Sequence, residues 1–118
     1  MKTLQEFMEG LRKAEYEFIR TEKKPFGYRI IGHKGGWTEK RILVYVHTKK
    51  VPTVSDFDKF LVFFEKFSKT HEAKYKVEAG YLVLSNCPKR LLQAFKTSIL
   101  KHASPDLRKR VKIVQVKA

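Results

Sequence analysis

The sequence holds few residues of several types, and each shortage argues against a class of protein. Cys87 is the only cysteine, so no disulfide can form within the chain and a cytoplasmic location is expected. No apolar run approaches the ~20 residues that a membrane-spanning helix needs. The N-terminal residues carry no signal-peptide pattern, and no targeting peptide is expected. These shortages disfavour a disulfide-stabilised scaffold and a membrane protein.

Acidic residues are the most informative shortage. The chain has 12 Asp+Glu against 26 Lys+Arg, a formal net charge of +14. The first 22 residues are nearly balanced, with four basic and five acidic side chains, so the excess lies downstream. A charge of this size indicates a polyanionic partner, nucleic acid before a membrane surface, because the cations do not gather on an amphipathic helix. Scarce Asn and Gln beside abundant Lys and Glu favour a thermophilic, archaeal-type source.

The length of 118 residues predicts one domain, residues 1–118, without repeats or linkers. Apolar residues at helical spacing predict a first helix over 2–20 and a second over 54–70, with Ser55 and Asp58 as its capping box. A third helix is expected to begin at Pro88. The expected strands are 28–32, 41–47, 74–77, 80–85 and 111–116. The order α-β-β-α-β-β-α-β predicts an α/β (α+β) fold with a mixed β-sheet flanked by helices.

Two segments carry a resemblance to a known family. Residues 29–36 read Arg-Ile-Ile-Gly-His-Lys-Gly-Gly, and residues 42–50 read Ile-Leu-Val-Tyr-Val-His-Thr-Lys-Lys, followed by the helix near Ser55. This pattern resembles the restriction-endonuclease-like (PD-(D/E)XK) nucleases, most of all the small archaeal Holliday junction resolvases and more loosely the Mrr-type nucleases. The resemblance covers roughly residues 4–85. It implies a restriction-endonuclease-like fold, a homodimer, and binding of branched or double-stranded DNA.

The catalytic positions of that family are changed here. The family uses an Asp and a Glu to hold a divalent metal and a Lys to position the attacking water. The resemblance puts Arg29 at the Asp position, Tyr45 at the Glu position and His47 at the Lys position. Because hard oxygen ligands are what Mg²⁺ requires, no metal site is expected. The resemblance thus implies a pseudo-nuclease that retains nucleic-acid binding, DNA before RNA, without a cofactor.

Two other functions stay open. An active endonuclease could use Glu39 as a relocated metal-binding carboxylate with Mg²⁺. A metal-independent one could use Tyr45, His47 and Lys49 or Lys50, a set that resembles in type the Tyr/His/Lys set of the tRNA-splicing endonucleases. Alternatively, the chain could be an RNA-binding structural or adaptor protein of a ribonucleoprotein or viral particle. Basic side chains bind the phosphate backbone of both DNA and RNA, so the charge alone does not choose between them.

The predicted binding residues come from basic clusters that lack matching acids. Trp37 joins them because it could stack on a base, although ordinary hydrophobic cover is the alternative interpretation. Helix capping explains Asp56 and Asp58 better than chemistry does, and Cys87 has no partner base for reactivity. The predicted nucleic-acid contacts are Arg29, Lys34, Trp37, Lys40, Arg41, Lys49, Lys50, Lys89, Arg90, Lys96, Arg108, Lys109 and Arg110.

Overall fold

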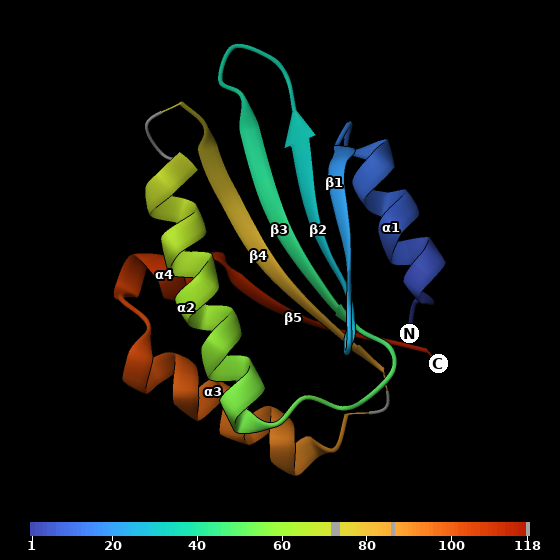
Figure 1. Cartoon of the computed structure of the whole chain (residues 1–118), viewed down its shortest axis with the longest axis vertical. Helices are drawn as coiled ribbons and strands as arrows, with labels where there is room; N and C mark the ends of the chain where they lie inside the picture. Colours follow the sequence, from blue (N-terminus) through green and yellow to red (C-terminus); the bar gives the residue numbers. More distant parts are fainter. Residues whose placement is uncertain (72–73, 86, 118) are drawn as a thin grey trace.

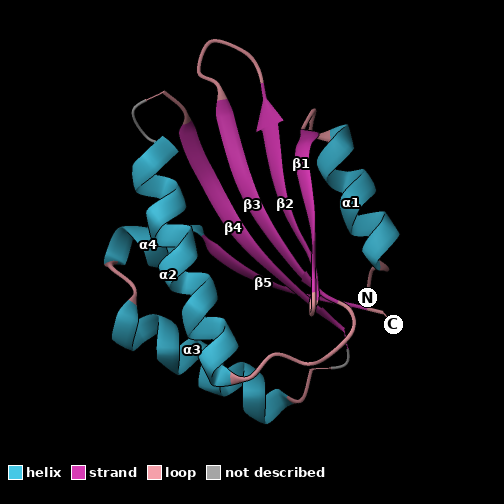
Figure 2. Cartoon of the chain, viewed as in Figure 1, coloured by secondary structure: helices cyan, strands magenta, loops and turns pink. Residues whose placement is uncertain are grey.

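A computed structural model describes residues 1–71, 74–85 and 87–117. It has an α+β architecture with one five-stranded mixed sheet flanked by helices (Figures 1 and 2). The elements in chain order are α1 (Leu4–Lys13), β1 (Glu17–Lys24), β2 (Gly27–Lys34), β3 (Lys40–His47), α2 (Val54–His71), β4 (Lys76–Ser85), α3 (Lys89–His102), α4 (Pro105–Arg110) and β5 (Val111–Val116).

The strands lie in sequence order across the sheet. Strands β1, β2 and β3 form an antiparallel meander, whereas β4 and β5 run parallel to β3. Parallel neighbours need crossover connections, and α2 supplies the first and α3 with α4 the second. The chain therefore has an antiparallel half, β1–β2, without helical crossovers, and a parallel half covered by three helices.

Helices cover the two faces of the sheet unequally. Helices α2, α3 and α4 lie on one face, with the rings of Phe57, Phe60, Phe64 and Phe95 fully buried there. Helix α1 lies on the other face, beside β1 in Figure 2, and its Leu11 packs with Ile30, Val44 and Val83. Gly80 leaves room for Phe64, because a Cβ there would come within 2.8 Å of the ring. The large α2-side core fixes the helix against β3 and β4.

The first helix is shorter than the sequence predicts. It ends at Lys13, and Glu15 adopts a positive φ of 73° that breaks the helical path. Residues 17–20, the expected end of that helix, instead begin strand β1, which runs to Lys24. Phe18 and Ile19 fit the apolar face of a helix, but the segment pairs with β2, and a bulge at Ile19 accommodates the two adjacent apolar residues. The predicted element order was therefore wrong in lacking this strand.

Three smaller expectations also need correction. The strands expected at 74–77 and 80–85 are one strand, β4, and a short helix, α4, precedes β5. The capping box of α2 lies two residues earlier than predicted: Thr53 N–H donates to Asp56 (2.9 Å), and Asp56 N–H donates to the Thr53 hydroxyl (3.1 Å). Asp56 thus caps the helix as expected, whereas Ser55 and Asp58 do not form the box.

Candidate nucleic-acid interface

Arg29, Tyr45 and His47 meet in one pocket. Arg29 on β2 pairs with Tyr45 on β3, and His47 lies two residues further along β3 on the same face. The pocket encloses about 220 Å³. Its other lining residues are Lys24, Phe26, Asp56 and Lys59. Adjacent strands and the start of α2 therefore bring together residues that lie far apart along the chain.

Arg29 is held on three sides. Its Nη2 donates to Glu22 at 2.8 Å, and its guanidinium lies over the Phe63 ring at 4.2 Å. Burial opposes its charge, but contacts with the Tyr45 hydroxyl and Glu22 raise the pKa of Arg29. The Arg29 hydrogen bond in turn lowers the pKa of Glu22. The site therefore presents a permanently charged, oriented guanidinium where the resemblance implies a metal-binding carboxylate.

Tyr45 and His47 are neutral at physiological pH. Burial raises the pKa of Tyr45, so its phenol keeps the proton. His47 is 4% exposed and stacks on Phe26 with ring centroids 4.2 Å apart. Burial lowers the pKa of His47 to about 4. His47 Nδ1 is buried and has no hydrogen-bond partner among the described residues. The pocket thus offers neutral polar groups beside the cations.

The burial of His47 should make the free energy of unfolding depend on pH. The unfolded chain binds the proton at an ordinary pKa of 6.5 and the folded chain only at about 4, so the stabilisation is complete above pH 6.5 and falls as the pH drops toward 4. His47→Phe keeps the aromatic stacking and should remove this part of the pH dependence. Chemical denaturation at several pH values between 7 and 4 measures it. If the free energies of unfolding of the wild type and His47→Phe change with pH in parallel, His47 is not the group responsible.

Carboxylates near the pocket are already engaged. Glu22 accepts from Arg29 and pairs with Lys24 at 3.4 Å, and Asp56 caps α2. No group of three or more His, Cys, Asp or Glu side chains suited to a metal occurs among the described residues. The arrangement of cations around aromatic rings can bind an anion.

The other weak catalytic candidates do not join this pocket. Glu39 is exposed in the β2–β3 connection, about 20 Å along β3 from Tyr45. Lys49 is exposed just beyond β3, at the pocket end of the strand, but it is not a lining residue. Tyr45 and His47 therefore share one pocket, as the strand period predicts, and Glu39 lies away from it.

The α2-side face of β1 and β2 extends the pocket along the sheet. A bulge at Ile19 sets Arg20, Glu22 and Lys24 on this side of β1, opposite Ile31, Arg29 and Gly27 of β2. These side chains are exposed or half-buried, unlike those of β3. We call this surface the β1–β2 open face. It carries Arg20, Glu22, Lys24, Arg29, Ile31 and His33.

Helix α2 carries two lysines and a phenylalanine along the edge of the β1–β2 open face. Lys59, Phe63 and Lys66 recur at helical spacing, and Phe63 contacts Arg29, so this stripe borders the β1–β2 open face. Neither lysine forms an ion pair with an acid among the described residues. We call these three residues the α2 stripe. With Lys24 and Arg29, the α2 stripe brings four cations to this side of the sheet, of which Lys24, Arg29 and Lys59 line the pocket.

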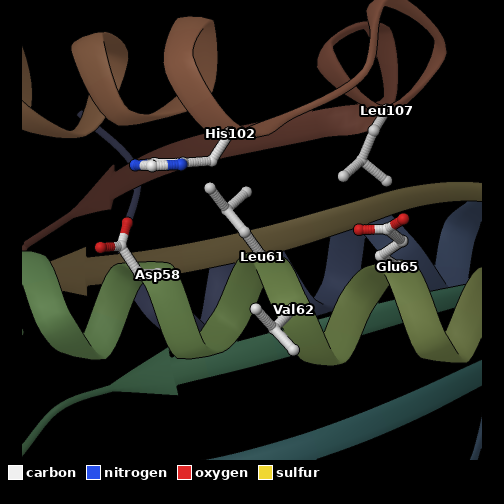
Figure 3. A pocket seen from close by; sticks show the side chains of 6 residues that line it. All are labelled: Asp58, Leu61, Val62, Glu65, His102 and Leu107. Carbon is white, nitrogen blue, oxygen red and sulfur yellow. The ribbon is translucent and has the colours of Figure 1, made fainter.

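Two acidic residues of α2 line a second hollow, toward α3. A hollow of about 330 Å³ between α2 and the α3–α4 layer is lined by Asp58, Glu65, His102 and three apolar residues (Figure 3). His102 extends from α3 toward Asp58 in this view. Asp58 also lies beside Lys59 and Lys66 at a shallow surface hollow, so the acids and the lysines of the α2 stripe are neighbours around the helix.

The predicted basic clusters lie in three places rather than one. Lys34, Trp37, Lys40 and Arg41 are at the hairpin end of the sheet, Lys49 and Lys50 at the other end, and the remainder on α3 and α4 (Figure 1). Several predicted contacts also have structural partners. Lys40 pairs with Glu78 (3.2 Å), Arg41 contacts His71 (3.0 Å) and Tyr75, Arg108 donates to the carbonyls of Ala103 and Leu100, and Arg110 pairs with Asp106 (2.7 Å).

Trp37 and Cys87 resolve two open interpretations. Trp37 is fully exposed at the hairpin tip, so the interpretation as hydrophobic cover was wrong. Cys87 is buried, and burial raises the pKa of its thiol, which agrees with an unreactive cysteine. A fully exposed tryptophan near Lys34 is available for stacking and reports on anything that covers it.

Sequence reasoning missed Lys24, Phe26, Lys59 and Lys66. Lys24 and Phe26 fell in what the pattern indicated was the end of a helix and the connection after it. Lys59 and Lys66 lie in the predicted second helix but belonged to none of the predicted basic clusters. The available signal was the i, i+4, i+7 recurrence of Lys59, Phe63 and Lys66, a half-apolar stripe beside the main core face.

Comparison with known proteins identifies no relative: no family model, curated protein or solved structure matches the chain. Among the described residues, no helix combines the length and apolarity needed to cross a bilayer.

Proposed function

We propose that this protein binds nucleic acid, DNA before RNA, through its phosphate backbone on a nuclease-like scaffold without the metal-binding carboxylates. The observation that carries the proposal is the pocket: an arginine and two neutral aromatic residues converge where the resemblance implies a metal site, and lysines surround them. Phosphate contacts from cationic side chains supply most sequence-independent affinity. We further propose that the protein acts as a homodimer in the cytoplasm.

The fold is compatible with the suggested relationship to the restriction-endonuclease-like nucleases. An N-terminal helix, a hairpin with Arg29 and Tyr45 on facing strands, and a Phe-rich helix occur in the implied order, with the additional strand β1 between the first helix and the hairpin. The proposed interface is the β1–β2 open face with the α2 stripe, joined by Lys50 at the end of β3. It is narrower than the sequence prediction, which also included α3 and α4.

A binding titration tests the proposal. We expect duplex, four-way junction and RNA to bind at low salt, with log K falling by about 0.9 per phosphate contacted for each unit of log[salt]. Fluorescence anisotropy at two salt concentrations measures this, and Trp37 emission gives a second signal. Running the series with and without Mg²⁺, followed by gel analysis, detects cleavage. No binding to any of the three at low salt would refute the proposal.

A charge-matched pair of variants locates the interface. Lys59→Gln/Lys66→Gln removes two positive charges from the α2 stripe, and Lys89→Gln/Lys96→Gln removes two from α3. All four lysines lack an ion pair with the acids that the structure describes. We expect the first pair to reduce the salt slope by about two and to weaken binding at least tenfold, and the second to change little. The reverse result would move the interface to α3.

A further inference from the structure

The pocket of Arg29, Tyr45 and His47 has unsatisfied polar groups in its wall. Arg29 Nε and His47 Nδ1 are both buried, and neither has a hydrogen-bond partner among the described residues. Leaving a buried polar group without a partner costs about 1–3 kcal/mol. Arg29 and His47 both line the hollow, and a ligand with several acceptor oxygens that reached these two atoms would satisfy both, since an imidazole N–H and a guanidinium N–H both donate.

The net positive charge around the pocket favours an anionic ligand. Lys24, Arg29 and Lys59 line the hollow, and Lys50 acts on both His47 and Asp56 at its edge. Against these four cations stand two carboxylates, Glu22 and Asp56, which leaves a formal charge of +2. An internal phosphodiester carries one negative charge, whereas a phosphomonoester carries about −1.5 to −2 at pH 7. The monoester is the closer match.

The size of the pocket limits the ligand to a small group. Its volume of about 220 Å³ is below the roughly 300–1,000 Å³ of sites that enclose whole drug-sized ligands. Phe26, Tyr45 and His47 form a rigid aromatic wall, with Phe26 stacked on both neighbours. Such a hollow suits a phosphoryl group whose remaining molecule lies outside, along the β1–β2 open face.

We propose that this pocket binds the terminal phosphomonoester of a nucleic-acid strand, with Arg29 and Lys59 as its main cationic contacts and His47 Nδ1–H as a neutral donor. This inference rests on the proposed nucleic-acid binding and adds an end preference to it. The strand beyond the terminal phosphate lies along the β1–β2 open face, where Arg20 and the α2 stripe contact the following phosphates.

Three oligonucleotides of one sequence test the end preference: one with a 5′-phosphate, one with a 3′-phosphate and one with hydroxyls at both ends. Two charge-assisted hydrogen bonds predict at least tenfold tighter binding of one phosphorylated form. Lys59→Gln should reduce this ratio severalfold. Lys66→Gln, on the same stripe but outside the pocket, should weaken all three alike and preserve the ratio. Equal affinity for the three would overturn the inference and leave backbone binding intact.

Nuclear magnetic resonance of the His47 ring identifies the group that enters the pocket. Inorganic phosphate and a nucleoside 5′-monophosphate should each shift the His47 nitrogen signals in the wild type and less in Lys59→Gln. A shift with phosphate but no binding of any oligonucleotide would refute the nucleic-acid proposal and with it the terminal-phosphate assignment. Oligonucleotide binding that leaves the His47 signals unmoved by all phosphorylated ligands would refute the terminal-phosphate assignment alone.

Discussion

Phe64→Ala should lower the free energy of unfolding by about 3–5 kcal/mol, the usual cost of emptying a large aromatic site in a core. Phe64 is fully buried on α2, and its ring covers Gly80 of β4 and stacks near Phe60. Neighbours cannot close the cavity easily, because Gly80 has no side chain to move into it. Urea denaturation followed by circular dichroism measures the change.

Val62→Ala is the matched control for this prediction. Val62 lies on the same helix, two residues away, but is 56% exposed. Its replacement should change the free energy of unfolding by no more than about 0.5 kcal/mol. If the two variants lose similar stability, α2 does not bury the face described above.

Gly27→Ala should destabilise the protein by about 3 kcal/mol, at the upper end of the cost of a strained backbone conformation. Gly27 opens β2 with a φ of 145°, a conformation that L residues rarely adopt, and a Cβ there would lie 2.1 Å from the Val46 carbonyl oxygen. The backbone must shift to relieve that contact, at the point where β2 pairs with the end of β3. Thermal denaturation of the variant beside the wild type measures the loss.

Gly35→Ala provides the comparison. Gly35 lies in the β2–β3 connection, and no atom comes within 4 Å of the position that an added methyl group would take. The stability of this variant should stay within about 0.5 kcal/mol of the wild type. Because both changes add one methyl group, a large loss at Gly27 alone isolates backbone conformation and close approach as the cause.

Much of the fold was predictable where apolar periodicity was unambiguous. The hairpin of β2 and β3, the helix α2 and the strand β5 lie within a few residues of their predicted bounds. Strand β1 was missed because the adjacent apolar residues Phe18 and Ile19 fit a helical period and break the alternation typical of a strand. Long-range pairing with β2 and the positive φ of Glu15 decide that segment, and neither is visible in a local pattern.

The candidate site was predictable in part. The strand period places Tyr45 and His47 on one face, and the family resemblance groups Arg29 with them. Sequence reasoning could not find Lys24, since that required knowing that β1 exists. Nor could charge runs along the chain show that Arg41 and Arg110 have partners of their own, because contacts with other elements supply them.

The one-residue bulge at Ile19 determines which side chains of the edge strand β1 face α2 and which face α1. If β1 paired with β2 without that insertion, every later residue of the strand would turn over. Arg20, Glu22 and Lys24 would then lie toward α1, and Arg29 would lose its counterion while the pocket lost a lysine. A one-residue length difference at this point would thus separate a chain that can present this surface from one that cannot.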